Sequence, residues 1–372
     1  MKAERDIAVT TIPFAVGLTA GLFLCTLFVQ NPHLITFSSV LALASTAIFL
    51  LHPNRSSWKS EIQWILIAAT FLFIGMMAGS GSHMLQYSDL GPGTLQETAM
   101  RLGRKTAEAI ERIPFANPAT NGIIKALITG ERNGIPQEIT NAFRESGASH
   151  ILALSGLHLG IIYGILKYLM IFIGNTPAAR TIRSAMIIIC CGAYTISTGC
   201  GPSIVRAFLF ILIGETAALT GRKASLAGIL MTAFIIQTLI RPSAIYEVGF
   251  QLSYAAVAGI AFIYPVLRDF WPTHELNEGT LPKGMRRIWN SAAMSIACQI
   301  TTGPIAYAYF GTFPDYFILT NLIALPLTGL LIPTALLTLA ATGLGICPDI
   351  LIKATEALVT ALTESLRVIS TM

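Results

Sequence analysis

Residues 147–164 read GASHILALSGLHLGIIYG and connect the longest polar segment of the chain to an apolar run. Small residues recur at every fourth position of this stretch, at Gly156, Gly160 and Gly164. On a helix they form one stripe, which lets a second backbone approach closely. At about 100° per residue, His158 lies about 160° from the centre of that stripe. The spacing therefore predicts a membrane helix with one face for packing and an imidazole on another.

Two polar side chains begin this run, Ser155 and His158, and being three residues apart they share a face. They admit three interpretations: hydrogen bonds that join helices, a nucleophile with its base, or the lining of a polar pathway. A hydrolase also needs a group that orients the base and a site for the oxyanion. The sequence indicates neither, so it favours the pathway and keeps the intramembrane hydrolase as an alternative.

The composition is that of a membrane protein. Of 372 residues, 53% are hydrophobic and only 12% are charged, whereas soluble domains average about 25% charged residues. Apolar runs of about 20 residues, enough to cross a hydrocarbon core of about 30 Å, recur along the chain. The six cysteines lie within or beside these runs without CxxC spacing or a histidine cluster. The sequence therefore predicts no disulfides, no metal site and no cofactor.

The apolar runs predict an all-α, polytopic helical membrane bundle. The first run is too long for the apolar core of a signal peptide, which has about 7–15 residues. Ten spans are expected at about 8–29, 34–51, 64–80, 149–174, 184–200, 203–220, 224–240, 247–267, 289–310 and 317–345. Residues 349–370 form an amphipathic helix, which either lies on the membrane surface or crosses as an eleventh span.

The chain divides into three predicted segments: an N-terminal three-span segment (1–80), an extracytoplasmic helical connector (81–147), and a transmembrane core with the C-terminal amphipathic helix (148–372). In the connector, Asn117 and Pro118 predict the N-cap and first residue of a helix that stops at Gly130. Pro136 and Gly147 bracket a further short helix. Seven basic residues balance seven acidic ones, so the connector is not a basic nucleic-acid patch.

The basic residues of the loops orient the bundle. With a cytoplasmic N-terminus, the inside segments hold twelve Lys and Arg, and the short outside loops hold only Arg241. Cytoplasmic loops are enriched in Lys and Arg, and long loops translocate despite their charge. The sequence therefore predicts a multi-pass protein with its N-terminus and residues 268–288 in the cytoplasm and residues 81–147 outside.

Polar residues also occur inside the later spans. A charged side chain at the centre of a span costs about 2.5–3.5 kcal/mol on an insertion scale. Arg206 and Glu215 are nine residues apart in one span, so they lie on opposite faces. Glu247, Gln251 and Tyr254 follow each other at helical spacing in another span. Polar groups in several spans favour a lined conduit.

Five stretches, in order, resemble the ComEC-type competence family: ALITGERNGI (126–135), SHILALSGLHLG (149–160), STGCGPSIVRA (197–207), RPSAIYEVGFQLSYAAV (241–257) and NLIALP (321–326). They cover about 126–326, which corresponds to the membrane core of that family, and the SGLH and GFQLSY stretches together are the most specific part. Six candidate pathway-lining residues fall on the motifs: His150, Ser155, His158, Arg206, Gln251 and Ser253. Tyr254 joins them from the helical stripe described above.

The resemblance implies an inner-membrane channel or permease of bacteria that conducts single-stranded DNA into the cytoplasm, and no enzyme. The implied partners are single-stranded DNA, the lipid bilayer, separate nuclease or ATPase proteins, and further copies of the chain in a homo-oligomer. Larger family members also carry OB-like and metallo-β-lactamase-like domains. We expect this chain to lack both, because residues 81–147 look helical and no HxHxDH-like cluster occurs. A transporter of a smaller solute, gated by spans broken at Pro304 and Pro326, remains the alternative.

Overall fold

The computed structural model describes Leu72 and residues 94–221, 224–270, 280–311, 313–346 and 348–372. The predicted N-terminal segment, 1–80, with its three spans, lies outside the described residues apart from Leu72. Across the described part the structure is helical without any strand, which confirms the all-α prediction. The described residues fall into two units, a larger one that contains residues 94–219 and Ala255–Met372, and a smaller one that contains Thr220–Tyr254. Each is considered by itself below.

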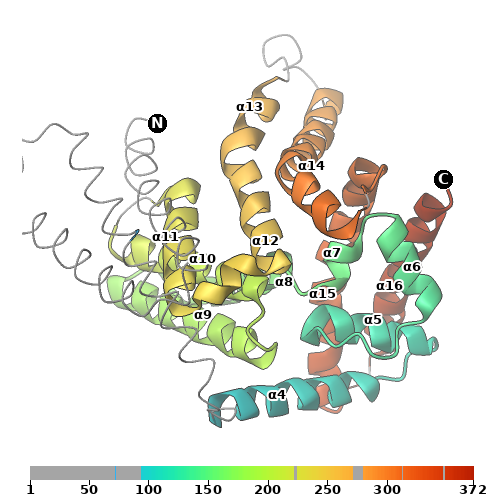
Figure 1. Cartoon of the computed structure of the whole chain (residues 1–372). Coiled ribbons are helices and arrows are strands. Elements are labelled where there is room, and N and C mark those ends of the chain that lie inside the picture. Colours follow the sequence, from blue (N-terminus) through green and yellow to red (C-terminus); the bar gives the residue numbers. More distant parts are fainter. Residues whose placement is uncertain (1–71, 73–93, 222–223, 271–279, 312, 347) are drawn as a thin grey trace, which may run out of the picture. The chain divides into compact units, whose positions relative to one another are not determined.

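The larger unit begins with three helices of the predicted connector: α4 (Thr94–Glu111), α5 (Pro118–Thr129) and α6 (Gln137–Glu145). The short α7 (Ser149–Leu152) leads into α8 (Gly156–Leu169), η2 (Met170–Ile173), α9 (Pro177–Ser197) and α10 (Pro202–Leu219). After the end of α12 (Val248–Ala258) come η4 (Gly259–Ile263), α13 (Tyr264–Asp269), α14 (Thr280–Phe310), α15 (Phe317–Gly343) and α16 (Asp349–Ser370). Figure 1 shows this order.

Five helices of the described residues are long and apolar enough to cross a membrane: Gly156–Ile173, Pro177–Ser197, Pro202–Leu219, Val248–Asp269 and Phe317–Gly343. The predicted count of ten or eleven spans is therefore not confirmed. Helix α11 (Leu226–Ile240) is apolar but shorter, with 15 residues. Helix α14 is long, but polar residues such as Asn290 and Gln299 interrupt its apolar character.

The predicted ends of the connector helices are confirmed. The Asn117 side chain accepts a hydrogen bond from the Ala119 backbone N–H (2.9 Å), and Pro118 is the first residue of α5. Gly130 ends α5 with a left-handed φ of 83°, a conformation in which glycine has no steric cost. Helix α6 starts directly after Pro136, as predicted.

The connector helices do not stand apart from the membrane core. Helix α5 buries Ile123, Ile124 and Leu127 in one hydrophobic cluster with Leu331 of α15 and Leu362 of α16. The main-chain N–H of Asn117 also donates to the Glu356 carboxylate on α16 (2.8 Å). One core therefore joins residues from both sides of the predicted boundary at 147 and 148.

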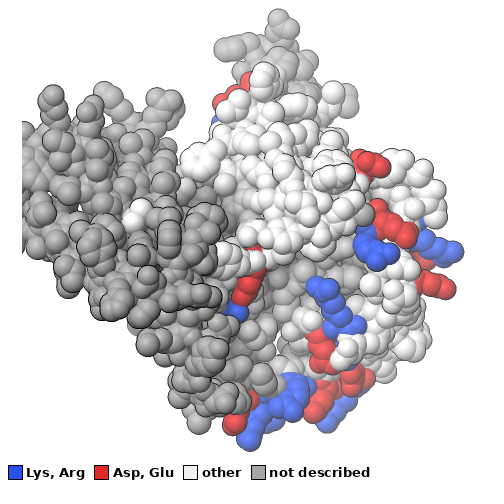
Figure 2. Space-filling view, viewed as in Figure 1, with Lys and Arg blue, Asp and Glu red and all other residues white. Residues whose placement is uncertain are grey.

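Helix α16 packs through its apolar face. Its buried residues are Ile352, Thr355, Val359, Leu362, Leu366 and Ile369. On the opposite stripe, Lys353, Thr360, Glu364 and Arg367 are exposed. Figure 2 shows charged side chains gathered over the region where Figure 1 places α4, α6 and α16, whereas little charge is visible over α13 and α14. The polar stripe of α16 therefore faces away from the core.

Helices α8, α9 and α10 pack with alternating directions. Gly156 of α8 lies beside Arg206 of α10, and Tyr163 further along α8 contacts Glu215 further along α10, so α8 and α10 run parallel. On α9 the order is reversed, because Ser184 contacts Glu215 while Gly192 faces Phe208. This alternation is what three consecutive membrane spans require, and it brings Tyr163 of α8 beside Glu215 of α10.

Candidate functional site

The polar start of α8 is built by a helix cap. Ser155 has extended backbone angles and is the N-cap, and its Oγ accepts the Leu157 backbone N–H (3.3 Å). The Ser155 backbone N–H in turn donates to Nδ1 of His158 (3.2 Å). This reciprocal arrangement is a capping box with histidine in the place of glutamate or glutamine. The predicted helix 149–174 is therefore interrupted at 153–155, because α7 ends at Leu152 with Ala153 as its C-cap and Ser155 is the N-cap of α8.

His158 is completely buried. Because its Nδ1 accepts the Ser155 N–H, the proton of the neutral ring belongs on Nε2. That Nε2 is buried and has no hydrogen-bond partner among the described residues. A buried donor left in this way costs about 1–3 kcal/mol unless a further group accepts its hydrogen bond. The geometry therefore favours an accepting group, such as water, next to His158.

The contact between Ser155 Oγ and His158 Nδ1 is 3.0 Å long, which also suits a nucleophile with its base. A catalytic pair needs a third group that orients the imidazole. Within the described residues no carboxylate hydrogen-bonds to His158, whose Nδ1 is already engaged by the helix cap. The cap therefore accounts for the Ser155–His158 contact without invoking hydrolysis.

Arg206 is a buried cation of α10, with 7% of its surface exposed. Its guanidinium lies over the Phe210 ring, 5.7 Å from the ring centre, within the range of cation–π attraction. Its Nη2 is also 3.0 Å from the point where a Cβ would stand on Gly156. The first turn of α8 therefore carries Arg206 on its Gly156 side. His158 lies about 200° around the helix from Gly156.

The glycine stripe has two different environments. At Gly156 a Cβ would also come within 3.3 Å of the Ala207 side chain, so this glycine permits close packing of α8 on α10. At Gly160 and Gly164 a Cβ would meet no described atom within 4 Å. Close packing is thus seen at Gly156, and no described residue packs closely on Gly160 or Gly164.

His150, the other motif histidine, lies in α7 and is exposed. Its Nδ1 is 3.0 Å from the Gly147 carbonyl oxygen. The neighbouring carbonyl of Ser146 accepts a hydrogen bond from Thr320 of α15 (2.7 Å). His150 therefore lies where the connector joins the N-terminal end of α15.

Gln251, Ser253 and Tyr254 belong to the smaller unit, with α11, η3 (Pro242–Tyr246) and the start of α12. Gln251 Nε2 donates to the Ile245 carbonyl (3.0 Å), and the Tyr254 hydroxyl donates to Gln237 of α11 (2.9 Å). Ser253 is half-buried. Gln251 and Tyr254, two of the three predicted lining residues, thus stabilise the connection between α11 and α12.

The same turn contains Glu247, another polar residue of the predicted helical stripe. Glu247 forms an ion pair with Arg241 across η3 (2.5 Å). The rings of Phe234, Phe250 and Tyr254 pack nearby in tilted and edge-on arrangements, with ring centres 4.4–5.7 Å apart. The RPSAIYEVGFQLSY motif therefore specifies a compact helical hairpin.

Glu215 is the acidic residue that the sequence places in the same span as Arg206, nine positions further along. In the structure its Oε1 accepts the Tyr163 hydroxyl (2.7 Å) and its Oε2 accepts the Ser184 hydroxyl (2.6 Å). Lys167 donates to the Tyr163 oxygen (2.9 Å) and lies 3.8 Å from the carboxylate. The four-residue spacing of Tyr163 and Lys167 was visible in the sequence, but their pairing with α10 depends on tertiary packing.

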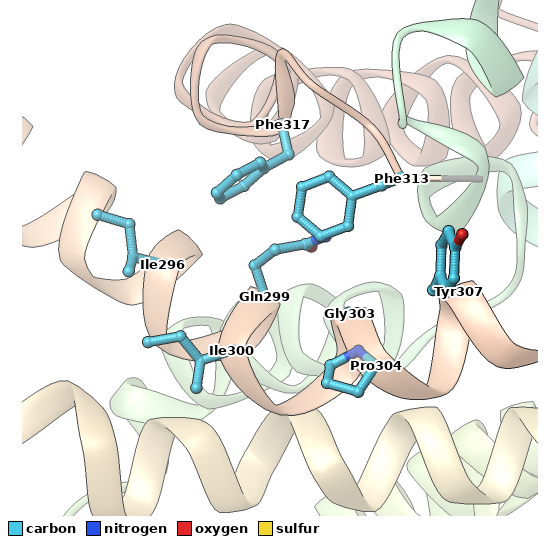
Figure 3. A pocket seen from close by; sticks show the side chains of 8 residues that line it. All are labelled: Ile296, Gln299, Ile300, Gly303, Pro304, Tyr307, Phe313 and Phe317. Atoms are coloured by element: carbon cyan, nitrogen blue, oxygen red, sulfur yellow. The ribbon is translucent and has the colours of Figure 1, made fainter. Parts of the chain in front are cut away.

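A groove lies beside Pro304 of α14. It has a volume of about 470 Å³ and is lined by Ile296, Gln299, Ile300, Gly303, Pro304, Tyr307, Phe313 and Phe317. Figure 3 shows the Phe313 and Phe317 rings on one side and Pro304 on the other, with Gln299 reaching toward Phe313. Apart from Gln299 and the Tyr307 hydroxyl, the side chains around it are apolar. Helix α14 runs without interruption past Pro304, as α15 does past Pro326 and Pro333.

These features define a class: a polytopic helical membrane protein with polar groups buried among its candidate spans. The chain belongs to the Competence protein family, whose model matches residues 127–372. The matched region starts inside α5 and contains all of the motifs from the SGLH stretch onward. This confirms the resemblance to the ComEC-type membrane core.

Three curated relatives match more than half of the chain. ComE operon protein 3 of Bacillus subtilis is 28% identical over 225 residues, which cover 59% of this chain and 26% of the relative. The uncharacterized protein YcaI of Escherichia coli is 28% identical over 211 residues, covering 56% and 27%. Competence protein ComA of Neisseria gonorrhoeae is 25% identical over 222 residues, covering 58% and 30%. The matches thus span only about a quarter to a third of each relative, and no solved structure matches.

Proposed function

We propose that this chain is a channel component of the bacterial inner membrane that conducts single-stranded DNA into the cytoplasm during competence. Its family indicates involvement in DNA uptake. The observation that carries the channel role is Arg206, a cation with 7% exposure inside a candidate span, packed over the first turn of α8. A DNA strand brings phosphate anions, which such a cation attracts.

Neutral polar groups suit the remainder of the path. Conduction requires contacts weak enough to release the strand, so a path lined by many cations would hold it. Ser155 and His158 supply a hydroxyl and an imidazole at the start of α8. His150 supplies a further polar group at the end of the connector. Gln251, Ser253 and Tyr254 of the smaller unit stay candidate lining residues from the sequence motifs. In this proposal the N-terminus is cytoplasmic and the connector is the outer, receiving side.

The proposal is tested by DNA uptake in a deletion strain complemented with variants. We expect Arg206→Gln to lower the uptake of labelled DNA per molecule of protein at least tenfold, while Arg206→Lys retains part of it. Arg180→Gln removes an exposed arginine from the first turn of α9 and is the matched control, with uptake unchanged. If the abundance of the Arg206→Gln variant falls in proportion to its DNA uptake, Arg206 is needed for folding and the proposal is contradicted.

Partner proteins are a further part of the proposal. On the ground of the family to which the chain belongs, we propose that separate polypeptides supply a nuclease and an energy source. Affinity purification from competent cells in mild detergent tests this. The chain is expected to co-purify with such proteins, and with tagged second copies of itself if the channel is a homo-oligomer.

A transporter of a smaller, apolar solute is the second candidate, and the groove on α14 favours it. Its volume of about 470 Å³ falls in the range of about 300–1,000 Å³ that is typical of small-molecule sites. Gly303→Leu would fill the groove, because a Cβ there already meets Phe313 at 3.1 Å. A metabolite phenotype of this variant with normal DNA uptake would support the solute transporter over the DNA channel.

A further inference from the structure

The carboxylate of Glu215 connects three candidate spans at one level. It accepts the Tyr163 hydroxyl from α8 and the Ser184 hydroxyl from α9, and it belongs to α10. Glu215 and Ser184 are both buried, with 7% and 5% exposure. Lys167, more than half exposed, reaches the same carboxylate and the same tyrosine. Hydrogen bonds to a carboxylate hold their groups in a defined geometry more firmly than hydrogen bonds between neutral groups do.

The position of this cluster along α10 matters for Arg206. Glu215 follows Arg206 by nine positions, about 13.5 Å of helix, and Tyr163 follows Gly156 by seven positions, about 10.5 Å. Helices α8 and α10 run parallel, so they are joined at two levels, by Arg206 over Gly156 and by Glu215 with Tyr163. The close contact at Gly156 does not by itself fix the rotation of α10 about its axis, because glycine has no side chain that could interlock with those of α10.

We infer that Glu215 is a positioning residue, which sets the rotation and height of α10 so that Arg206 stays over the start of α8. The inference rests on the proposed function, in which Arg206 attracts the DNA strand. It assigns a role to a buried acidic residue that has no attraction for DNA of its own. Substitution of Glu215 should therefore reduce uptake only through Arg206.

The first test measures geometry and needs no substrate. Spin labels are placed on Leu157→Cys, which is exposed on α8, and on Cys200, which is exposed just before α10, with the other five cysteines replaced. We expect Glu215→Leu to shift or broaden the distance between the labels in lipid nanodiscs, and Tyr163→Phe to do so less. An unchanged distance distribution in Glu215→Leu would overturn the positioning role, whatever the protein transports.

The second test measures whether the two residues act together. Uptake per molecule should fall in Glu215→Leu, and the double variant with Arg206→Gln should be no worse than Arg206→Gln alone. Thr338→Val is the control. It removes the hydrogen bond between the Thr338 and Thr355 hydroxyls in the core between α15 and α16, and any loss of uptake that it causes should multiply with the loss caused by Arg206→Gln. If the losses of uptake caused by Glu215→Leu and by Arg206→Gln multiply in the double variant, the inference is overturned. Normal uptake in the Arg206→Gln variant with an altered label distance would instead refute the proposed function and leave the positioning role intact.

Discussion

Arg206 Nη2 lies 3.0 Å from the point where a side chain would begin on Gly156. This relationship joins a buried cation of α10 to the first turn of α8, where Ser155 and His158 form the cap. A residue larger than glycine at position 156 would have to displace the guanidinium. The small residue and the cation are therefore parts of one arrangement, although 50 positions separate them in the sequence.

Gly156→Leu is expected to destabilise the protein by about 1–3 kcal/mol, the usual effect of overpacking. Gly160→Leu, one helical turn further along the same stripe, is the matched control, because no described atom lies within 4 Å of its Cβ position. Thermal unfolding of both variants in detergent gives the comparison. Equal destabilisation would show that Gly160 is also packed closely in the membrane.

The helix cap predicts a second difference. Ser155→Ala removes the acceptor for the Leu157 N–H and should lower stability by about 1 kcal/mol, whereas Ser155→Asn, also a good N-cap, should retain most of it. Melting temperatures of the purified variants test this order. A Ser155→Ala protein as stable as the wild type would mean that His158 alone holds the first turn.

Lys125 predicts a dependence on pH in the connector. It is buried in α5, and its ammonium donates to Glu111 (2.7 Å) and lies 3.5 Å from Glu131. The hydrogen bond to Glu111 raises the pKa of Lys125 above its ordinary value of 10.5. The folded state thus holds this proton more tightly than the unfolded state does. The stabilisation is complete below about pH 10.5 and is lost as the pH rises through the raised pKa.

Unfolding of the wild type and of Lys125→Met at pH 8 and pH 11 checks this prediction. The variant should be less stable at pH 8, and the difference should shrink at pH 11. Lys105→Met, which removes an exposed lysine of α4, is the control and should change little at either pH. A constant difference for Lys125→Met would show that packing of its side chain, rather than its charge, stabilises α5.

The orientation predicted from the loop charges indicates which cysteines a membrane-impermeant reagent should reach. On a background without native cysteines, Asn133→Cys in the connector should be labelled from outside intact cells, and Arg286→Cys in α14 only after the cells are opened. Both positions are exposed. The reverse pattern would invert the predicted topology and place the connector in the cytoplasm.

Local sequence signals predicted the connector helices well. Asn117, Pro118 and Gly130 mark the ends of α5 through contacts within a few residues, so the neighbouring chain suffices to specify them. Likewise, the glycine at every fourth position from Gly156 indicated a helix with a stripe of small residues on one face. The predicted continuous helix from 149 was wrong because the cap at Ser155 depends on side-chain hydrogen bonds that helical periodicity does not reveal.

The sequence by itself determined that this protein is a helical membrane protein of the competence family, because apolar run length, loop charge and local motifs are properties of short segments. Only the tertiary structure decided which polar residues meet. It paired Glu215 with Tyr163 and Ser184, and it buried His158. It also turned the polar stripe of α16 away from the core. Such choices depend on which helices become neighbours, and helix packing is set by contacts between residues far apart in the chain.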